Sequence, residues 1–135
     1  MLEPVVAAYR DLGLRVVLAP SMADAPFHGM MPGLLDVVPA RVSRRLERLA
    51  AAPTTRVLQL AESAIRRFHG VASGQVRTAV SPSIPGLCSD ELLQGLAALA
   101  REHGVGAHTH VAESRFQVAQ AQRRWGRPII SQLCA

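Results

Sequence analysis

Two histidines and a glutamate stand close together in the run from Gly104 to Ser114, GVGAHTHVAES. His108 and His110 are one residue apart, and Glu113 follows three residues after the second histidine. In an extended segment, side chains at i and i+2 face the same way, so both imidazoles are expected to project together and Thr109 to point opposite. Converging imidazoles suit a divalent metal such as zinc, and a nearby carboxylate can shuttle protons. Taken alone, the H-x-H pair is a weak signal, and it is more often explained by hydrogen-bonded histidines at a strand end.

Two further candidates stand in expected loops. His28, in PFHGMMPG, could line a substrate pocket or be an ordinary loop histidine. Cys88, in SPSIPGLCSDE, could touch a ligand, although a nucleophilic cysteine needs a base partner that the sequence does not identify. We predict both His28 and Cys88 as substrate contacts.

The elements that must position these residues follow from periodicity and from Gly and Pro punctuation. We expect helices over 2–12, within 40–69 as two segments, over 91–103 with Ser89 as N-cap, and from about 114 to 125. Strands are expected over 14–19, 75–80 and 105–111, with Pro20 stopping the first. The long loop 20–39, the proline-containing loop 81–91 and the final RPIISQLCA are left without regular structure.

Strands that alternate with helices predict a parallel α/β sheet, because right-handed crossovers place a helix between neighbouring strands. In such folds, functional groups gather at the carboxyl ends of the strands. Both long loops and the histidine pair fall at those ends. We therefore expect the site there.

Composition predicts a folded protein. The chain has 135 residues, 49% of them hydrophobic, and a mean hydropathy of +0.17, which fits one domain over 1–135. No apolar run reaches the length of a membrane span, and the start MLEPVVAAYRDLG lacks the features of a secretory signal. These features predict a cytoplasmic protein without a membrane partner. Cys88 and Cys134 form no C-x-x-C pair and are expected to be free thiols.

The net charge of +5 raises the question of nucleic-acid binding. All 15 basic residues are arginine, and the densest cluster puts Arg41, Arg44, Arg45 and Arg48 on one stripe of a helix. Glu47 interrupts this cluster, and no aromatic residues are interleaved for stacking. We expect a solvated helix face and no nucleic-acid partner. The alternative predicts binding that weakens steeply as salt rises.

The run SPSIPGLCSDELLQGLAALAREHGVGAHTHVAES resembles the region from strand four to strand five of the amidohydrolase superfamily. The similar branch contains cytosine and guanine deaminases and triazine chlorohydrolases, whose fifth barrel strand ends in H-x-x-E, matched here by His110 to Glu113. LRVVLAPSM resembles the family's third strand, and RRWGRPIISQL the segment leading toward strand six. The resemblance implies a partial (β/α) TIM-type barrel with about three parallel strands and flanking helices.

The resemblance also implies roles. His110 matches the metal-binding histidine of strand five, Glu113 matches the glutamate that protonates the leaving group or ring nitrogen, and His108 faces the same cavity. The implied reaction is metal-assisted hydrolysis or deamination at a carbon–nitrogen bond of a nitrogen heterocycle or amidine, with zinc or iron as the divalent metal. The family's strand-one H-x-H, its histidine after strand six and its aspartate after strand eight have no assigned counterpart. Reading HTH as the strand-one pair is an alternative, and it also leaves ligands missing.

We therefore expect an excerpt or truncated product of an amidohydrolase that is inactive as this chain alone. Because the barrel would be incomplete, its exposed sheet edges are expected to drive self-association. A non-catalytic α/β binding or assembly module is the alternative.

Overall fold

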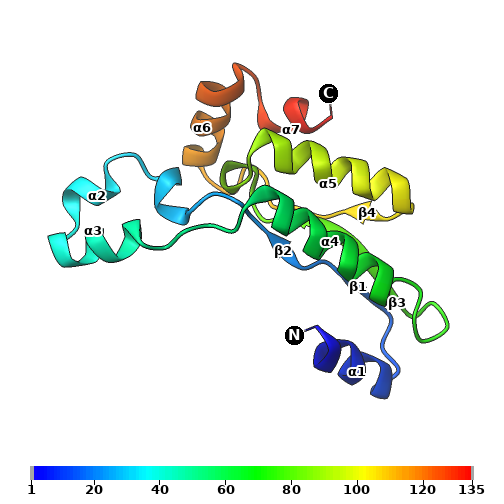
Figure 1. Ribbon diagram of the computed structural model, residues 1–135. Coiled ribbons are helices and arrows are strands. Elements are labelled where there is room, and N and C mark those ends of the chain that lie inside the picture. Colours follow the sequence, from blue (N-terminus) through cyan, green and yellow to red (C-terminus); the bar gives the residue numbers. More distant parts are fainter. Residues whose placement is uncertain (1, 135) are drawn as a thin grey trace.

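The computed structural model describes residues 2–134. Helices and strands alternate along the chain as expected (Figure 1). In chain order they are α1 (Glu3–Asp11), β1 (Val16–Leu18), β2 (Ser21–Met22), the 3-10 helix η1 (Phe27–Met30), α2 (Leu34–Val37), α3 (Ala40–Glu47), α4 (Thr54–Phe68), β3 (Val76–Pro82), the 3-10 helix η2 (Pro85–Leu87), α5 (Asp90–His103), β4 (Gly106–Ala107), α6 (Arg115–Trp125) and α7 (Ile129–Leu133).

The sheet is parallel, and β3 is its central strand. β1 and β2 pair with β3 in one register, since Val16 faces Val76 and Ser21 faces Ser81, each 60 positions further along the chain. They are therefore two parts of one interrupted strand. β4 pairs with β3 through Gly106 and Ala107 along the other edge. The parallel α/β arrangement and the count of about three strands agree with the prediction.

The first strand is interrupted at Pro20, as expected, but its pairing with β3 does not end there. The chain returns to the same register at Ser21, because a proline removes only its own N–H from the ladder. Pro82 likewise lies within β3, as its last residue. A proline at a strand interruption or end removes a single N–H donor, so the backbone pairing on either side of it is kept.

The main core lies between the sheet and the adjacent helices α4 and α5 (Figure 1). Its buried members include Val57, Ala61 and Ile65 of α4, Val80 of β3, and Leu92 and Leu96 of α5. The two helices approach closely at Gly95, where an added Cβ would lie 2.7 Å from Leu58 Cδ1. A smaller cluster joins α1 to β1, β3 and the end of α4 through Val6, Leu18, Val76, Ala64 and Phe68.

Helices cover only one face of the sheet at the amino-terminal ends of its strands. Val76 and Leu18 are buried against helices, whereas the register partners Val17 and Arg77 are exposed, Val17 to 61%. Because side chains alternate along a strand, Val17 and Arg77 share the opposite face. That face has no second layer in residues 2–134.

The α2–α3 arm, residues 34–47, projects away from the rest of the chain (Figure 1). None of its residues is buried. The four arginines of the predicted basic stripe are all exposed there or just beyond. Their exposure agrees with a solvated helix face.

Two expectations near the C-terminus need correction. The predicted strand over 105–111 shrinks to β4, because its outer edge has no neighbour and its ladder with β3 ends early. The segment RPIISQLCA contains a helix, α7, which begins after Pro128 and buries Ile129. Within residues 2–134, the longest helices fall short of what crossing a membrane requires in length and apolar character.

Candidate functional site

The histidine pair lies just after β4, beside the carboxyl end of β3. His108 N–H donates to the Val80 carbonyl at 2.9 Å, and His110 N–H donates to the Ser83 carbonyl at 3.4 Å. The segment thus stays extended along β3 although its formal strand has ended. The two rings lie edge to face, with centroids 5.9 Å apart and planes at 80°. Both side chains are exposed.

Thr109 differs from its two neighbours in exposure. Its hydroxyl is buried and finds no hydrogen-bond partner among the described residues, while the flanking imidazoles face outward. This alternation is what an extended segment produces. The histidines consequently share the face of the sheet that the helices leave bare.

Glu113 is positioned by the start of α6. Ala112 adopts a left-handed conformation, with φ of 56°, which turns the chain after the histidines. Ser114 then caps α6 by accepting a hydrogen bond from Gln117 N–H at 3.3 Å. The Gln117 side chain reaches back, accepting from Glu113 N–H at 3.0 Å and donating to Glu113 Oε2 at 2.9 Å. Gln117 is itself only 7% exposed.

Gln117 is a residue that our sequence reasoning missed. Ser114 and Gln117 have the S-x-x-Q spacing of a capping box, in which the glutamine side chain reaches back to the start of the helix. That spacing is the sequence signal from which the contact of Gln117 with the start of α6 could have been predicted. Here the glutamine reaches one residue further back than the usual motif, to the residue preceding the cap.

The carboxylate and the imidazoles border different spaces within this chain. Glu113 lines an open hollow of ≈ 600 Å³ whose other walls are Ala112, Ser114, Arg115, Val118, Ala119 and Gln122. Neither His108 nor His110 lines it. The chain therefore brings the two histidines together but does not enclose them in one cavity with Glu113.

A full metal site is not assembled by this part of the chain. Among residues 2–134, no group of three or more His, Cys, Asp or Glu side chains could hold a metal ion. A catalytic zinc usually takes three protein ligands and one open position. The residues present therefore do not fit a complete metal centre by themselves, and the histidine pair supplies at most part of one.

The other two candidates lie in the loops that follow β2 and β3. His28 is half-buried in η1. Cys88 is buried to 1% exposure in the main core, and its thiol donates to the Met22 carbonyl at 3.5 Å. Burial raises the pKa of Cys88 to about 11, so the thiol stays protonated near neutral pH. A substrate contact by His28 or Cys88 stays a prediction, and packing accounts for Cys88 in this structure.

Asp24 fastens the same loops together. Its carboxylate accepts hydrogen bonds from Ser89 N–H at 2.7 Å, from the Ser89 hydroxyl, and from the Thr54 hydroxyl at 2.7 Å. Ser89 is the N-cap of α5, as predicted, and Thr54 begins α4. Burial alone would raise the pKa of Asp24, but the hydrogen bonds from Ser89 and Thr54 outweigh it and hold that pKa below its ordinary value. Asp24 thus joins the loop after β2 to the starts of α4 and α5 at the carboxyl edge of the sheet.

Arg124 makes a second tie at this edge. Its guanidinium donates to the carbonyls of Pro85 and Cys88 at 3.1 and 2.9 Å and to Asp90 at 2.8 Å. These bonds hold α6 against the loop between β3 and α5. The helix that begins beside Glu113 is therefore fixed to the loop that follows the central strand.

Comparison with known proteins agrees with the likeness seen in the sequence. Residues 2–132 match the amidohydrolase family. The chain belongs to that family. A 5'-deoxyadenosine deaminase of Methanothermobacter thermautotrophicus is 30% identical over 125 residues, which cover 93% of this chain and 24% of that protein. A 5-methylthioadenosine/S-adenosylhomocysteine deaminase of Symbiobacterium thermophilum is 40% identical over 77 residues, 56% of this chain and 18% of that protein.

Solved structures confirm the predicted fold. An atrazine chlorohydrolase from Arthrobacter aurescens, crystallised with zinc, aligns with a TM-score of 0.70 at 24% identity over 98% of this chain and 26% of its own. Guanine deaminase from C. acetobutylicum aligns with a TM-score of 0.67 at 16% identity over 90% and 24%. This amidohydrolase chain therefore spans about a quarter of such proteins and contains part of their barrel.

Proposed function

We propose that this amidohydrolase segment belongs to a metal-dependent enzyme that hydrolyses or deaminates a carbon–nitrogen bond of a nitrogen heterocycle or amidine. The relatives named as deaminases and the guanine deaminase neighbour support this substrate class. The observation that carries the proposal is the adjacent His108 and His110 rings at the carboxyl end of a parallel sheet. Working groups in such sheets gather at that end.

In this proposal His110, aided by His108, contributes imidazole nitrogens to a divalent metal, zinc or iron. Zinc in a structural neighbour supports the choice of metal class. Such a metal, when bound, lowers the pKa of a water molecule and orients it. Glu113 carries the proton to the leaving group or ring nitrogen, and Gln117 holds its carboxylate in one orientation. His28 and Cys88 keep their proposed places as substrate contacts.

We further infer that residues 1–135 act as one segment of a barrel and are inactive alone. The lack of a three-ligand cluster in residues 2–134 favours this. The same observation keeps the non-catalytic module as the competing function for the isolated chain.

We also propose a cytoplasmic location, no nucleic-acid partner and self-association through the open edges of β1 and β4.

The test is a chimera in which this chain replaces its matched segment of the M. thermautotrophicus 5'-deoxyadenosine deaminase. We expect ammonia release from 5'-deoxyadenosine and bound metal near one equivalent. H110A should lose metal and activity together, whereas E113Q should keep metal and lose activity by about 10²-fold or more. H103A, a histidine at the end of α5, is the matched control and should keep both.

A chimera that folds and keeps its metal and activity after H110A would show that this histidine is not a ligand. The isolated chain separates the two functions. Stoichiometric zinc or iron bound to the natural chain and lost from the H110A variant supports a working partial site. A natural chain without bound metal supports the non-catalytic binding or assembly module.

A further inference from the structure

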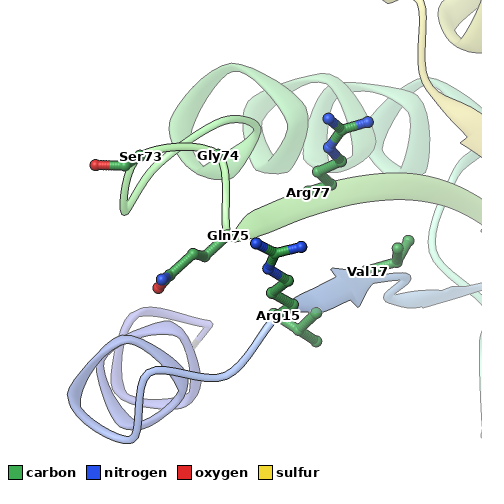
Figure 2. Close-up of a pocket in the computed structure, with 7 residues that line it drawn as sticks. Arg15, Val17, Ser73, Gly74, Gln75 and Arg77 are labelled. Atoms are coloured by element: carbon green, nitrogen blue, oxygen red, sulfur yellow. The ribbon is translucent and has the colours of Figure 1, made fainter.

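Two arginines stand together at the amino-terminal end of the sheet, opposite to the histidines. Arg77 of β3 faces Val17 of β1, and Arg15 comes two residues before Val17 and so shares its face. Figure 2 shows both arginine side chains projecting to the same side of the two neighbouring strands. The backbone of the two adjacent parallel strands therefore places both arginines on one face of the sheet.

The arginines project from the face that helices leave bare. Val76 and Leu18, which alternate with them, are packed beneath α1 and α4. Arg15, Val17 and Arg77 are all exposed. The matched proteins contain about four times the length of this chain, and in a closed barrel this face becomes the wall of the interior.

No acidic side chain among residues 2–134 balances the charge of this pair. Four arginines form ion pairs, namely Arg10 with Asp11, Arg66 with Glu62, Arg67 with Glu3 and Arg124 with Asp90. Arg15 and Arg77 have no acidic partner within the part of the chain that the structure describes. Like charges on neighbouring strands repel each other, and covering them without an anion is costly.

The space around the arginines has the size and donors of a small binding site. They line a hollow of ≈ 460 Å³ together with Val16, Val17, Ser73, Gly74 and Gln75. Ser73 and Gln75 belong to its wall, but Figure 2 shows their side chains directed away from the two arginines, so the guanidinium groups are the donors that it offers. No Asp or Glu lines this hollow.

We propose that Arg15 and Arg77 form an oxyanion-binding site at the amino-terminal end of the sheet. Guanidinium groups bind carboxylate and phosphate oxygens through paired N–H donors, and one anion between them removes their mutual repulsion. The oxyanion has two possible sources, a free phosphate-sized anion or a carboxylate of the chain that completes the barrel. The site is remote from the histidines and does not rest on the proposed activity.

The first experiment titrates the chain with inorganic phosphate at constant ionic strength and follows the amide resonances of Gly74, Gln75 and Arg77 by NMR. We expect saturable shifts confined to this hollow. R15Q and R77Q should each weaken phosphate binding at least five-fold. R66Q, which removes a paired arginine from α4, is the charge-matched control and should change it less than two-fold. Absence of saturation, or an equal effect of R66Q, overturns the site.

The second experiment distinguishes the sources in the chimeric barrel described above. If a barrel carboxylate occupies the pair, phosphate leaves the melting temperature unchanged and R77Q lowers it by several degrees more than R66Q. If the ligand is a free anion, phosphate raises the melting temperature saturably and R77Q abolishes that rise. A barrel that responds neither to phosphate nor to R77Q, relative to R66Q, contradicts the proposal. These readouts are independent of deaminase activity.

Discussion

Gln117 holds Glu113 at two points, accepting from its backbone N–H at 3.0 Å and donating to its carboxylate Oε2 at 2.9 Å. The glutamine is nearly buried, whereas Glu113 is exposed. The buried carboxamide of Gln117 therefore fixes the orientation of the exposed Glu113 carboxylate. Such support is what a proton-transferring side chain needs if it is to meet substrate in one orientation.

Replacing Gln117 should weaken the chain itself. Q117A removes both bonds to Glu113 and leaves its N–H without that acceptor, so we expect the free energy of unfolding to fall by about 1–3 kcal/mol. Urea denaturation measures this change. Q122A, on the exposed side of α6, should cost less than about 0.5 kcal/mol. Equal losses in the two variants would mean that the two hydrogen bonds between Gln117 and Glu113 contribute nothing to stability.

Asp24 should make stability depend on acid pH. Its folded pKa lies below the ordinary 3.8, so the stabilisation is present above that value and is lost as pH falls through the folded pKa. D24N should lower the free energy of unfolding by about 1–3 kcal/mol at pH 7, with a difference that shrinks below about pH 4. D36N, in the exposed α2, is the control. A D24N deficit that is constant from pH 7 to pH 3 would rule out this linkage.

The two thiols should react at very different rates. Cys134 is exposed, whereas burial raises the pKa of Cys88 to about 11. At pH 8 only about a thousandth of Cys88 would be thiolate even if reagent reached it. Native chain should therefore release one equivalent of chromophore rapidly from a thiol-specific disulfide reagent and a second only in denaturant. A C134S variant that still reacts rapidly in the folded state would show Cys88 to be accessible.

Gly95 and Leu58 should be energetically coupled. Alanine favours a helix over glycine by about 1 kcal/mol, but at position 95 its Cβ would press on the Leu58 methyl groups. We expect G95A to stabilise the chain more in an L58A background than in the natural one, with a coupling of at least about 0.5 kcal/mol. A double-mutant cycle by urea denaturation measures it. Additive effects would indicate that Leu58 moves aside without cost.

Self-association should depend on the outer edge of β4. His108 N–H points to β3, so the preceding Ala107 N–H points outward and is open to a second chain. A107P removes that donor while sparing the bond to Val80. We expect the natural chain to elute as an oligomer in size-exclusion chromatography and A107P to shift toward monomer. A natural chain that remains a compact monomer at high concentration would contradict edge pairing.

Much of the fold was open to prediction because its signals are local. Ser89 does cap α5, accepting from Leu92 N–H at 3.0 Å, and Gly104 ends that helix in a left-handed conformation. Apolar runs marked the strands. The strand ends could not be read in the same way, because pairing with β3 decides them. Thus the chain resumes its pairing with β3 after Pro20, and β4 ends as a formal strand at Ala107 although His108 N–H still bonds to the Val80 carbonyl.

Some features of the candidate site likewise follow from local sequence patterns, and others depend on residues far apart in the sequence. The shared direction of His108 and His110 follows from the two-residue period of extended chain and was predicted. The bonds of Asp24 join it to residues 30 and 65 positions away, and no local pattern announces such partners. The separation of Glu113 from the histidines is also beyond local reasoning, since it follows the left-handed turn at Ala112.

The interrupted first strand has a consequence for the order of folding. β3 finds β4 across 27 positions but reaches β1 and β2 only across 60. Closing the longer loop costs about 0.7 kcal/mol more in chain entropy, so the βαβ unit of β3, α5 and β4 is expected to form first. During synthesis β1 and β2 emerge before β3, so their backbone hydrogen-bonding groups stay unpaired and open to other chains until β3 follows.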